Sequence, residues 1–227
     1  WCGYCKKLEA TAFEDKRVLL LSEEFVSVPI DGDGGPGSEL KTAYGVKGYP
    51  SIPVMTAQEE IVGRLGSYEG DTAAVYAQEM AKLLQKHSLS RLKKAAAKND
   101  LSALAVLAAM HISLNKLNEA ENALDQAAQI VEKTPAKNAR LAVANIALAD
   151  LYMAQRDFGG AIVMLEHALK VAEKGFLVEA QLKLGYSLLE NGNKTEAIKH
   201  LTAAKESPDA NDAARELATQ FLDKAGA

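Results

Sequence analysis

The pattern of apolar and polar positions changes near residue 87. From Ser88 onward, Leu, Ala and Ile recur at helical spacing between polar turns, and glycine and proline become rare. Before that point, short β-branched runs alternate with turns rich in glycine and proline. We therefore predict two domains, a mixed α/β domain at residues 1–86 and an all-α domain at residues 87–227.

The first domain is expected to contain its elements in the order α-β-α-β-β-α. The predicted elements are a helix over Lys6–Leu21 that breaks near Ala12–Asp15, a strand at Phe25–Ile30, a helix at Ser38–Tyr44, a hairpin of Ser51–Thr56 and Glu60–Leu65, and a helix capped by Asp71 that runs to about Lys86. Pro53 removes one donor from the hairpin ladder and predicts a bulge or a sheet edge at that position.

The helical domain repeats itself. Three triplets of residues fall into one register: Ala120, Ala161 and Ala197, then Leu124, Leu165 and Leu201, then Ala127, Ala168 and Ala204. Each unit predicts a helix, a tight turn and a second helix. The pattern resembles the tetratricopeptide repeat, although the intervals from Ala120 to Ala161 and from Ala161 to Ala197 are 41 and 36 residues rather than about 34. Asn211–Lys224 is the expected terminal cap, and a plain helical bundle is the alternative.

Charge and composition exclude several classes of protein. The 227 residues carry 26 Lys and Arg against 30 Asp and Glu, a net charge of -4, which is too balanced for binding to nucleic acid by counterion release. No apolar run approaches the roughly 18 residues that a membrane-spanning helix needs, so no membrane span is predicted. Two cysteines are too few for the disulfide framework of a small secreted protein.

The chemistry that the sequence suggests lies in its first five residues. Cys2 and Cys5 are three positions apart, so they are close enough to form a disulfide at the start of a helix. The positive end of a helix lowers the pKa of a thiol, which makes Cys2 the candidate nucleophile and Cys5 the resolving thiol. A zinc site is the alternative, but there is no third cysteine and the four histidines are scattered, so we predict neither a metal nor a cofactor.

A second motif supports the interpretation that the two cysteines are a redox pair. Trp1-Cys-Gly-Tyr-Cys-Lys6, followed by Val46-Lys-Gly-Tyr-Pro-Ser51 and Gly66, resembles the thioredoxin superfamily over residues 1–86, and within it domains similar to the C-terminal domain of the transmembrane reductase DsbD. The resemblance implies a cis-proline at Pro50. It also implies a substrate-binding surface made of Trp1, Gly3, Tyr4, Tyr49 and Pro50.

That family has a central strand directly before the tryptophan of this motif. We therefore expect a further strand upstream of Trp1, together with the acid that accepts a proton from the resolving thiol and any signal peptide. The expected fold class is thus an α/β thioredoxin-like domain whose N-terminal strand precedes Trp1, followed by an all-α domain similar to tetratricopeptide repeats.

The glycine-rich segment from Asp31 to Gly37 resembles two kinds of ligand-binding loop, and we exclude both. As a calcium loop it has Gly35 at position five and Thr42 at position twelve, where a bidentate Glu is needed. As a phosphate loop it lacks the terminal Gly-Lys-Ser/Thr. We predict a flexible loop.

The function expected from these motifs is that of a thiol-disulfide oxidoreductase, an enzyme in which Cys2 attacks a protein disulfide and Cys5 resolves it. The helical repeats would recruit protein substrates or partners, and an upstream thiol or electron-donor protein would recharge the pair. The alternative is a holdase chaperone or adaptor whose repeats bind clients that the redox pair protects or regulates. A structural scaffold with a vestigial redox pair is a third, disfavoured interpretation.

Two questions stay open at this level. The inner face of the repeats is apolar and poor in basic residues, so it either grips hydrophobic clients or packs against the first domain or another copy of the chain. The cysteine usage and the family resemblance favour a periplasmic or extracytoplasmic location, and a cytoplasmic one stays possible.

Overall fold

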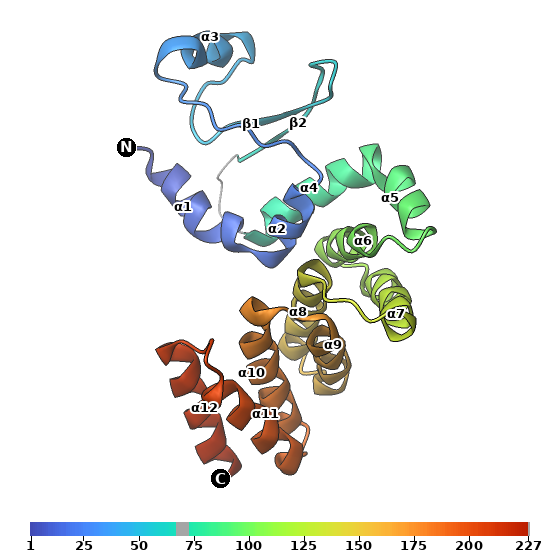
Figure 1. Cartoon of the computed structure of the whole chain (residues 1–227). Helices are drawn as coiled ribbons and strands as arrows, with labels where there is room; N and C mark the ends of the chain where they lie inside the picture. Colours follow the sequence, from blue (N-terminus) through green and yellow to red (C-terminus); the bar gives the residue numbers. More distant parts are fainter. Residues whose placement is uncertain (67–72, 227) are drawn as a thin grey trace.

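The computed structural model describes residues 1–66 and 73–226 (Figure 1). Its first part contains short helices and one hairpin, and the rest of the chain is a curved array of helices. The elements of the first part are α1 (Gly3–Thr11), the 3-10 turn η1 (Ala12–Glu14), α2 (Lys16–Ser22), α3 (Gly35–Ala43), β1 (Ile52–Met55), β2 (Ile61–Leu65) and α4 (Ala73–His87).

The first predicted helix breaks where the sequence suggested. Asp15 has an extended backbone conformation, and its carboxylate accepts a hydrogen bond from the backbone N–H of Arg17 at 2.9 Å. Such a side chain satisfies a donor at the start of a helix, so α2 begins anew after Asp15. The predicted break at Ala12–Asp15 is confirmed.

The hairpin is also confirmed, but the predicted strand before it is not. β1 and β2 pair in antiparallel fashion, with Ile52 opposite Leu65 and an irregularity between Val54 and Met55, close to the bulge predicted at Pro53. Phe25–Ile30 forms no strand, because no ladder among the described residues reaches it and a strand needs a paired neighbour. The described residues therefore form a two-stranded sheet, and the thioredoxin-like sheet stays a prediction.

The helical part is built from pairs of antiparallel helices. It contains α5 (Leu89–Ala96), α6 (Leu101–Ser113), α7 (Leu117–Lys133), α8 (Ala139–Ala154), α9 (Phe158–Val171), α10 (Lys174–Glu190), α11 (Lys194–Glu206) and α12 (Asp212–Ala225). The predicted cap helix is α12, and the side chain of Asn211 caps it by accepting the N–H of Ala214 at 2.8 Å. The predicted cap at Asp71 lies outside the described residues.

The repeat register is confirmed by burial. All nine residues that the sequence placed in register are buried, and the six alanines among them are small enough to let helix backbones approach each other. Gly185 shows how close this approach is, because a Cβ added there would lie 2.5 Å from the Cγ of Leu201 on α11.

The turns inside the helix pairs keep the same register. Asn115, Arg156 and Gly192 each adopt a left-handed backbone, with φ of 55°, 61° and 86°. They are separated by the same intervals as the aligned alanines. Glycine and asparagine tolerate this conformation, whereas arginine pays a steric cost, so the turn before α9 is imposed by the packing of its helices.

Helix α2 lies on the inner side of the array, where it contacts the first helices of two pairs, α6 and α8 (Figure 1). Val18, Leu20 and Leu21 of α2 are buried in one apolar cluster that continues through α4 into α10. The apolar core thus crosses the boundary predicted at residue 87. No helix among residues 1–66 and 73–226 has both the length and the apolar character that crossing a membrane requires.

Candidate functional site

The two cysteines form a disulfide at the N-terminus of α1. The Sγ atoms of Cys2 and Cys5 are 2.09 Å apart and their Cα atoms 5.3 Å apart. Cys2 is the N-cap residue, and its Sγ accepts a hydrogen bond from the backbone N–H of Cys5 at 3.1 Å. One turn of helix brings the two side chains together, and Cys2 lies at the N-terminal end of the helix, where the backbone N–H groups point outward.

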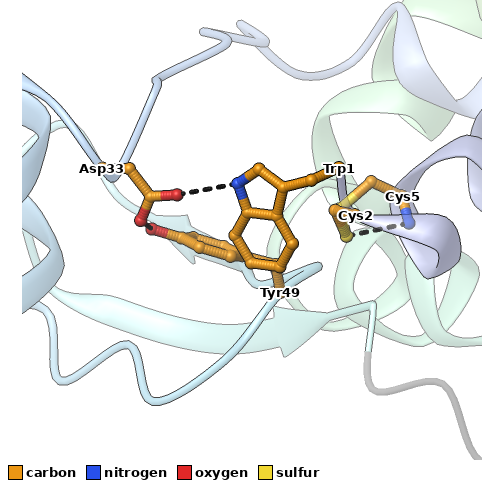
Figure 2. The surroundings of a disulfide bond; sticks show 5 residues. All are labelled: Trp1, Cys2, Cys5, Asp33 and Tyr49. Atoms are coloured by element: carbon orange, nitrogen blue, oxygen red, sulfur yellow. Dashed lines mark hydrogen bonds between the residues drawn. A yellow bond between two sulfur atoms is a disulfide. The ribbon is translucent and has the colours of Figure 1, made fainter.

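Trp1 extends from the disulfide towards two residues that are distant in sequence (Figure 2). Its indole Nε1 donates a hydrogen bond to Oδ2 of Asp33 at 3.1 Å, and its ring meets the ring of Tyr49 edge to face with centroids 5.8 Å apart. The hydroxyl of Tyr49 donates to Oδ1 of the same carboxylate at 2.9 Å. Trp1, Asp33 and Tyr49 therefore form a closed triangle next to Cys2.

The carboxylate of Asp33 is held in its charged form by these contacts. The hydroxyl of Tyr49, followed by the indole of Trp1 and the ammonium group of Lys41, holds the pKa of Asp33 below its ordinary value. The ammonium group of Lys41 lies 3.5 Å from Oδ1 of Asp33 and also sits over the ring of Tyr49.

Of the remaining predicted substrate-binding residues, Gly3 and Tyr4 lie between the two cysteines and Pro50 follows Tyr49. The peptide bond between Tyr49 and Pro50 is cis, as the family resemblance implied. Gly66, the residue after β2, lies beside Pro50, and a Cβ added there would be in ordinary van der Waals contact with it, 3.6 Å from its Cβ and carbonyl oxygen. Gly3 opens α1 with free space on its Cα, and the ring of Tyr4 is 60% exposed.

Asp33 is the residue that sequence reasoning missed. The segment from Asp31 to Gly37 was predicted to be a flexible loop, but the structure anchors it through Asp33 to Trp1 and Tyr49. Nothing in the local sequence pattern connects positions 33 and 1. The sequence feature that could have indicated this anchor is the high number of glycines in the loop. Gly32 lies against the hydroxyl of Tyr49, and a Cβ added to Gly32 would be 2.4 Å from that oxygen.

Side chains of the kinds that bind metal ions are not gathered into a site in the described part of the chain. Among residues 1–66 and 73–226, no three His, Cys, Asp or Glu side chains are grouped so that they hold a metal ion. His111, His167 and His200 sit on separate helices of the array, and burial lowers the pKa of each. They are packing residues of the helices.

Ion pairs hold the first part of the chain to the array. Lys16 of α2 pairs with Glu179 of α10 at 2.8 Å, and Glu179 also lies 3.1 Å from Lys183. Burial alone would raise the pKa of Glu179, but the two ammonium groups together hold it below its ordinary value. Glu23 and Glu24 add pairs to Arg140 and Arg91 on α8 and α5.

The inner face of the array is thus partly occupied. Helix α2 packs against α6 and α8, and the inner-face residues predicted on these two helices include Ala105, Ala109, Ile112, Val143 and Ile146, which are all buried. The sequence left open whether this face binds clients, packs against the first domain or packs against another copy of the chain. At α6 and α8 it packs against the first domain, through α2. Beside α2, a cavity of about 340 Å³ is lined by Glu14, Asp15, Lys16, Arg17, Ala147, Asp150 and Leu151.

Beyond α8 the array carries an aromatic cluster on its later helices. The ring of Tyr186 on α10 meets Phe158 edge to face at 5.9 Å and Phe221 of α12 at 5.0 Å. All three rings are half-buried, so this surface combines apolar area with access to solvent. Aromatic residues in such positions are frequent at protein interfaces.

Residues 101–134 match the family model of the tetratricopeptide repeat. The matched residues are those of α6 and α7, which form the first of the helix pairs in register. A search of the curated proteins and a search of the solved structures each found no match. The helical part of the chain is tetratricopeptide-like, and repeats of this kind indicate protein partners.

Proposed function

We propose that this protein is a thiol-disulfide oxidoreductase of the thioredoxin-like type that acts on protein disulfides. The observation that carries the proposal is the Cys2–Cys5 disulfide at the N-terminus of α1, with Trp1 next to it and the ring of Tyr49, the residue before the cis proline, against the indole. After reduction, the Cys2 thiolate would lie at the positive end of the α1 dipole and accept the N–H of Cys5, and both interactions favour the ionised form.

The proposed reaction runs through a mixed disulfide. The Cys2 thiolate attacks one sulfur of the substrate disulfide, and the other substrate sulfur leaves as a thiolate and takes up a proton. Cys5 loses its proton and attacks Sγ of Cys2, which releases the second substrate sulfur as a thiol. Two electrons pass from the dithiol to the substrate, and a dithiol of a donor protein must then reduce the Cys2–Cys5 disulfide and itself become a disulfide.

The helical repeats supply the protein-binding part of the proposal. Because α2 covers the inner face at α6 and α8, we place partner binding on the surface around α10 and α12, where the aromatic cluster of Tyr186 lies. The apolar cluster that contains α2 extends into α10, the helix that carries Tyr186, so α10 connects the proposed partner surface to the first part of the chain. We place the protein in an extracytoplasmic, oxidising compartment, since its only two cysteines form the redox pair.

One observation favours the alternative, a holdase or adaptor. The apolar side chains of the segment before α3 face solvent, with Val26 95% and Val28 69% exposed. Exposed apolar side chains that follow each other along an extended segment are suited to binding unfolded protein. In that case the redox pair would protect or regulate the bound client.

The experiment that tests the proposed reaction traps its intermediate. The Cys5→Ser variant of the full chain, reduced and then mixed with insulin, is expected to accumulate a covalent adduct through Cys2 that dithiothreitol releases. The reason is that the resolving thiol is missing. Mass spectrometry of the mixture gives the measurement. Equal adduct formation by the Cys2→Ser variant through Cys5 would contradict the assigned roles.

A further inference from the structure

We propose that Asp33 is a positioning residue, which fixes Trp1 and Tyr49 as one rigid contact surface for protein substrates beside the Cys2–Cys5 disulfide. The inference rests on the proposed oxidoreductase function and assigns a role to a loop that the motifs do not explain. It is carried by the two hydrogen bonds that Asp33 accepts, from the indole of Trp1 at 3.1 Å and from the hydroxyl of Tyr49 at 2.9 Å.

Trp1 needs such an anchor because few neighbouring side chains pack against it. Its side chain is 88% exposed, and an exposed side chain keeps several rotamers unless a directional contact selects one. The edge-to-face contact with Tyr49 and the hydrogen bond to Asp33 both favour the same orientation of the Trp1 ring. A surface ordered before binding costs less entropy when a substrate docks on it.

A carboxylate suits this role because it offers two acceptor oxygens. Oδ2 faces Trp1, while Oδ1 faces Tyr49 and, at 3.5 Å, the ammonium group of Lys41. An amide in its place keeps one acceptor oxygen and turns an NH₂ donor towards the other partner. Because the hydroxyl of Tyr49 can accept from that donor, asparagine at position 33 is expected to weaken both contacts through the loss of the charge, which also removes the ion pair with Lys41, and not to release a ring.

The loop itself is built to hold Asp33 in place. The N–H of Asp33 donates to Oδ1 of Asp31 at 3.0 Å, which closes a local turn. Gly37 passes so close to the carbonyl of Asp31 that an added Cβ would lie 1.8 Å from its oxygen. These contacts fix the backbone on both sides of the carboxylate.

The test compares Asp33→Ala and Asp33→Asn with the control Glu39→Gln in the full chain. Glu39 is exposed on α3, and its replacement changes the charge as Asp33→Asn does. The first measurement is the fluorescence anisotropy of Trp1, the only tryptophan of the chain. The others are kcat and KM for insulin reduction with dithiothreitol, and the single-turnover rate of the reduced protein with a small aromatic disulfide.

The expected result separates large from small substrates. For Asp33→Ala we expect a lower Trp1 anisotropy and a KM for insulin about 10-fold higher, with kcat within a factor of about two. The rate with the small disulfide stays within about twofold, since that substrate does not reach across Trp1 and Tyr49. Asp33→Asn, which removes the charge, and Tyr49→Phe, which removes the hydroxyl, each weaken the triangle and are expected to raise KM about threefold, and Glu39→Gln leaves it unchanged.

The outcomes distinguish the inference from the proposed function. If the wild type reduces insulin and Asp33→Ala matches its KM and anisotropy, the role of Asp33 is overturned while the oxidoreductase stands. If all substrates, small and large, slow equally in Asp33→Ala and Tyr49→Phe, Asp33 supports the fold rather than the contact surface. A wild type without turnover on either disulfide overturns the proposed function and the inference with it.

Discussion

Replacement of Cys2 by serine is expected to reduce the catalysed rate of insulin reduction to the rate of dithiothreitol alone. Serine keeps the helix start intact, because its hydroxyl accepts the N–H of Cys5 as Sγ of Cys2 does. It has no thiolate and forms no disulfide, so the first step of the reaction is lost. The rate of insulin precipitation with and without the variant measures the effect.

The same variant separates the enzyme from the holdase. Suppression of aggregation of a heat-denatured, cysteine-free client depends on the repeats and on exposed apolar side chains, so under the holdase interpretation it survives Cys2→Ser. Lys6→Ala, one residue past Cys5 on the exposed side of α1, is the matched control and is expected to keep full turnover. Undiminished insulin reduction by Cys2→Ser would remove Cys2 from the mechanism.

Leu21→Ala is expected to destabilise the whole chain by about 2–5 kcal/mol. The side chain of Leu21 is fully buried in the apolar cluster that joins α2 to the helical array. Removing it loses transfer free energy and leaves a cavity between the two parts. Urea unfolding followed by circular dichroism at 222 nm, which reports the helices, gives the free energy of unfolding.

Leu19 offers the matched control on the same helix. It is 49% exposed, so Leu19→Ala is expected to change the free energy of unfolding by less than about 1 kcal/mol. A continuous core also predicts that Trp1 fluorescence and helical signal are lost in one transition in the wild type. If Leu21→Ala moves the fluorescence transition alone and leaves the helical transition in place, the two parts unfold independently.

The helical array could be predicted well from the sequence because its signals are local and periodic. The recurrence of Ala120, Ala161 and Ala197 identified buried positions in the helix pairs, and Asn211 predicted the start of the last helix. The left-handed turn at Arg156 could not be foreseen, since arginine gives no signal for that conformation and the turn follows from how α8 and α9 pack.

The first part of the chain was less predictable because its contacts join distant residues. Phe25–Ile30 has the composition of a strand, but strand formation depends on a neighbour that no local pattern reveals. The cysteines and Pro50 were found by motif, whereas Asp33 carries its role only through hydrogen bonds to positions 1 and 49. The packing of α2 against α6 and α8 was one of several uses left open.

The most direct test of the central claim is an equilibrium redox titration of the Cys2–Cys5 pair in the full chain, followed by Trp1 fluorescence and thiol labelling. We expect a single two-electron transition between about -270 and -120 mV, the range that redox-active pairs of thioredoxin-like proteins cover. A value near the lower limit indicates a reductase, and one near the upper limit an oxidant or isomerase. A pair that stays reduced or stays oxidised across the whole range would contradict the claim that it is redox-active.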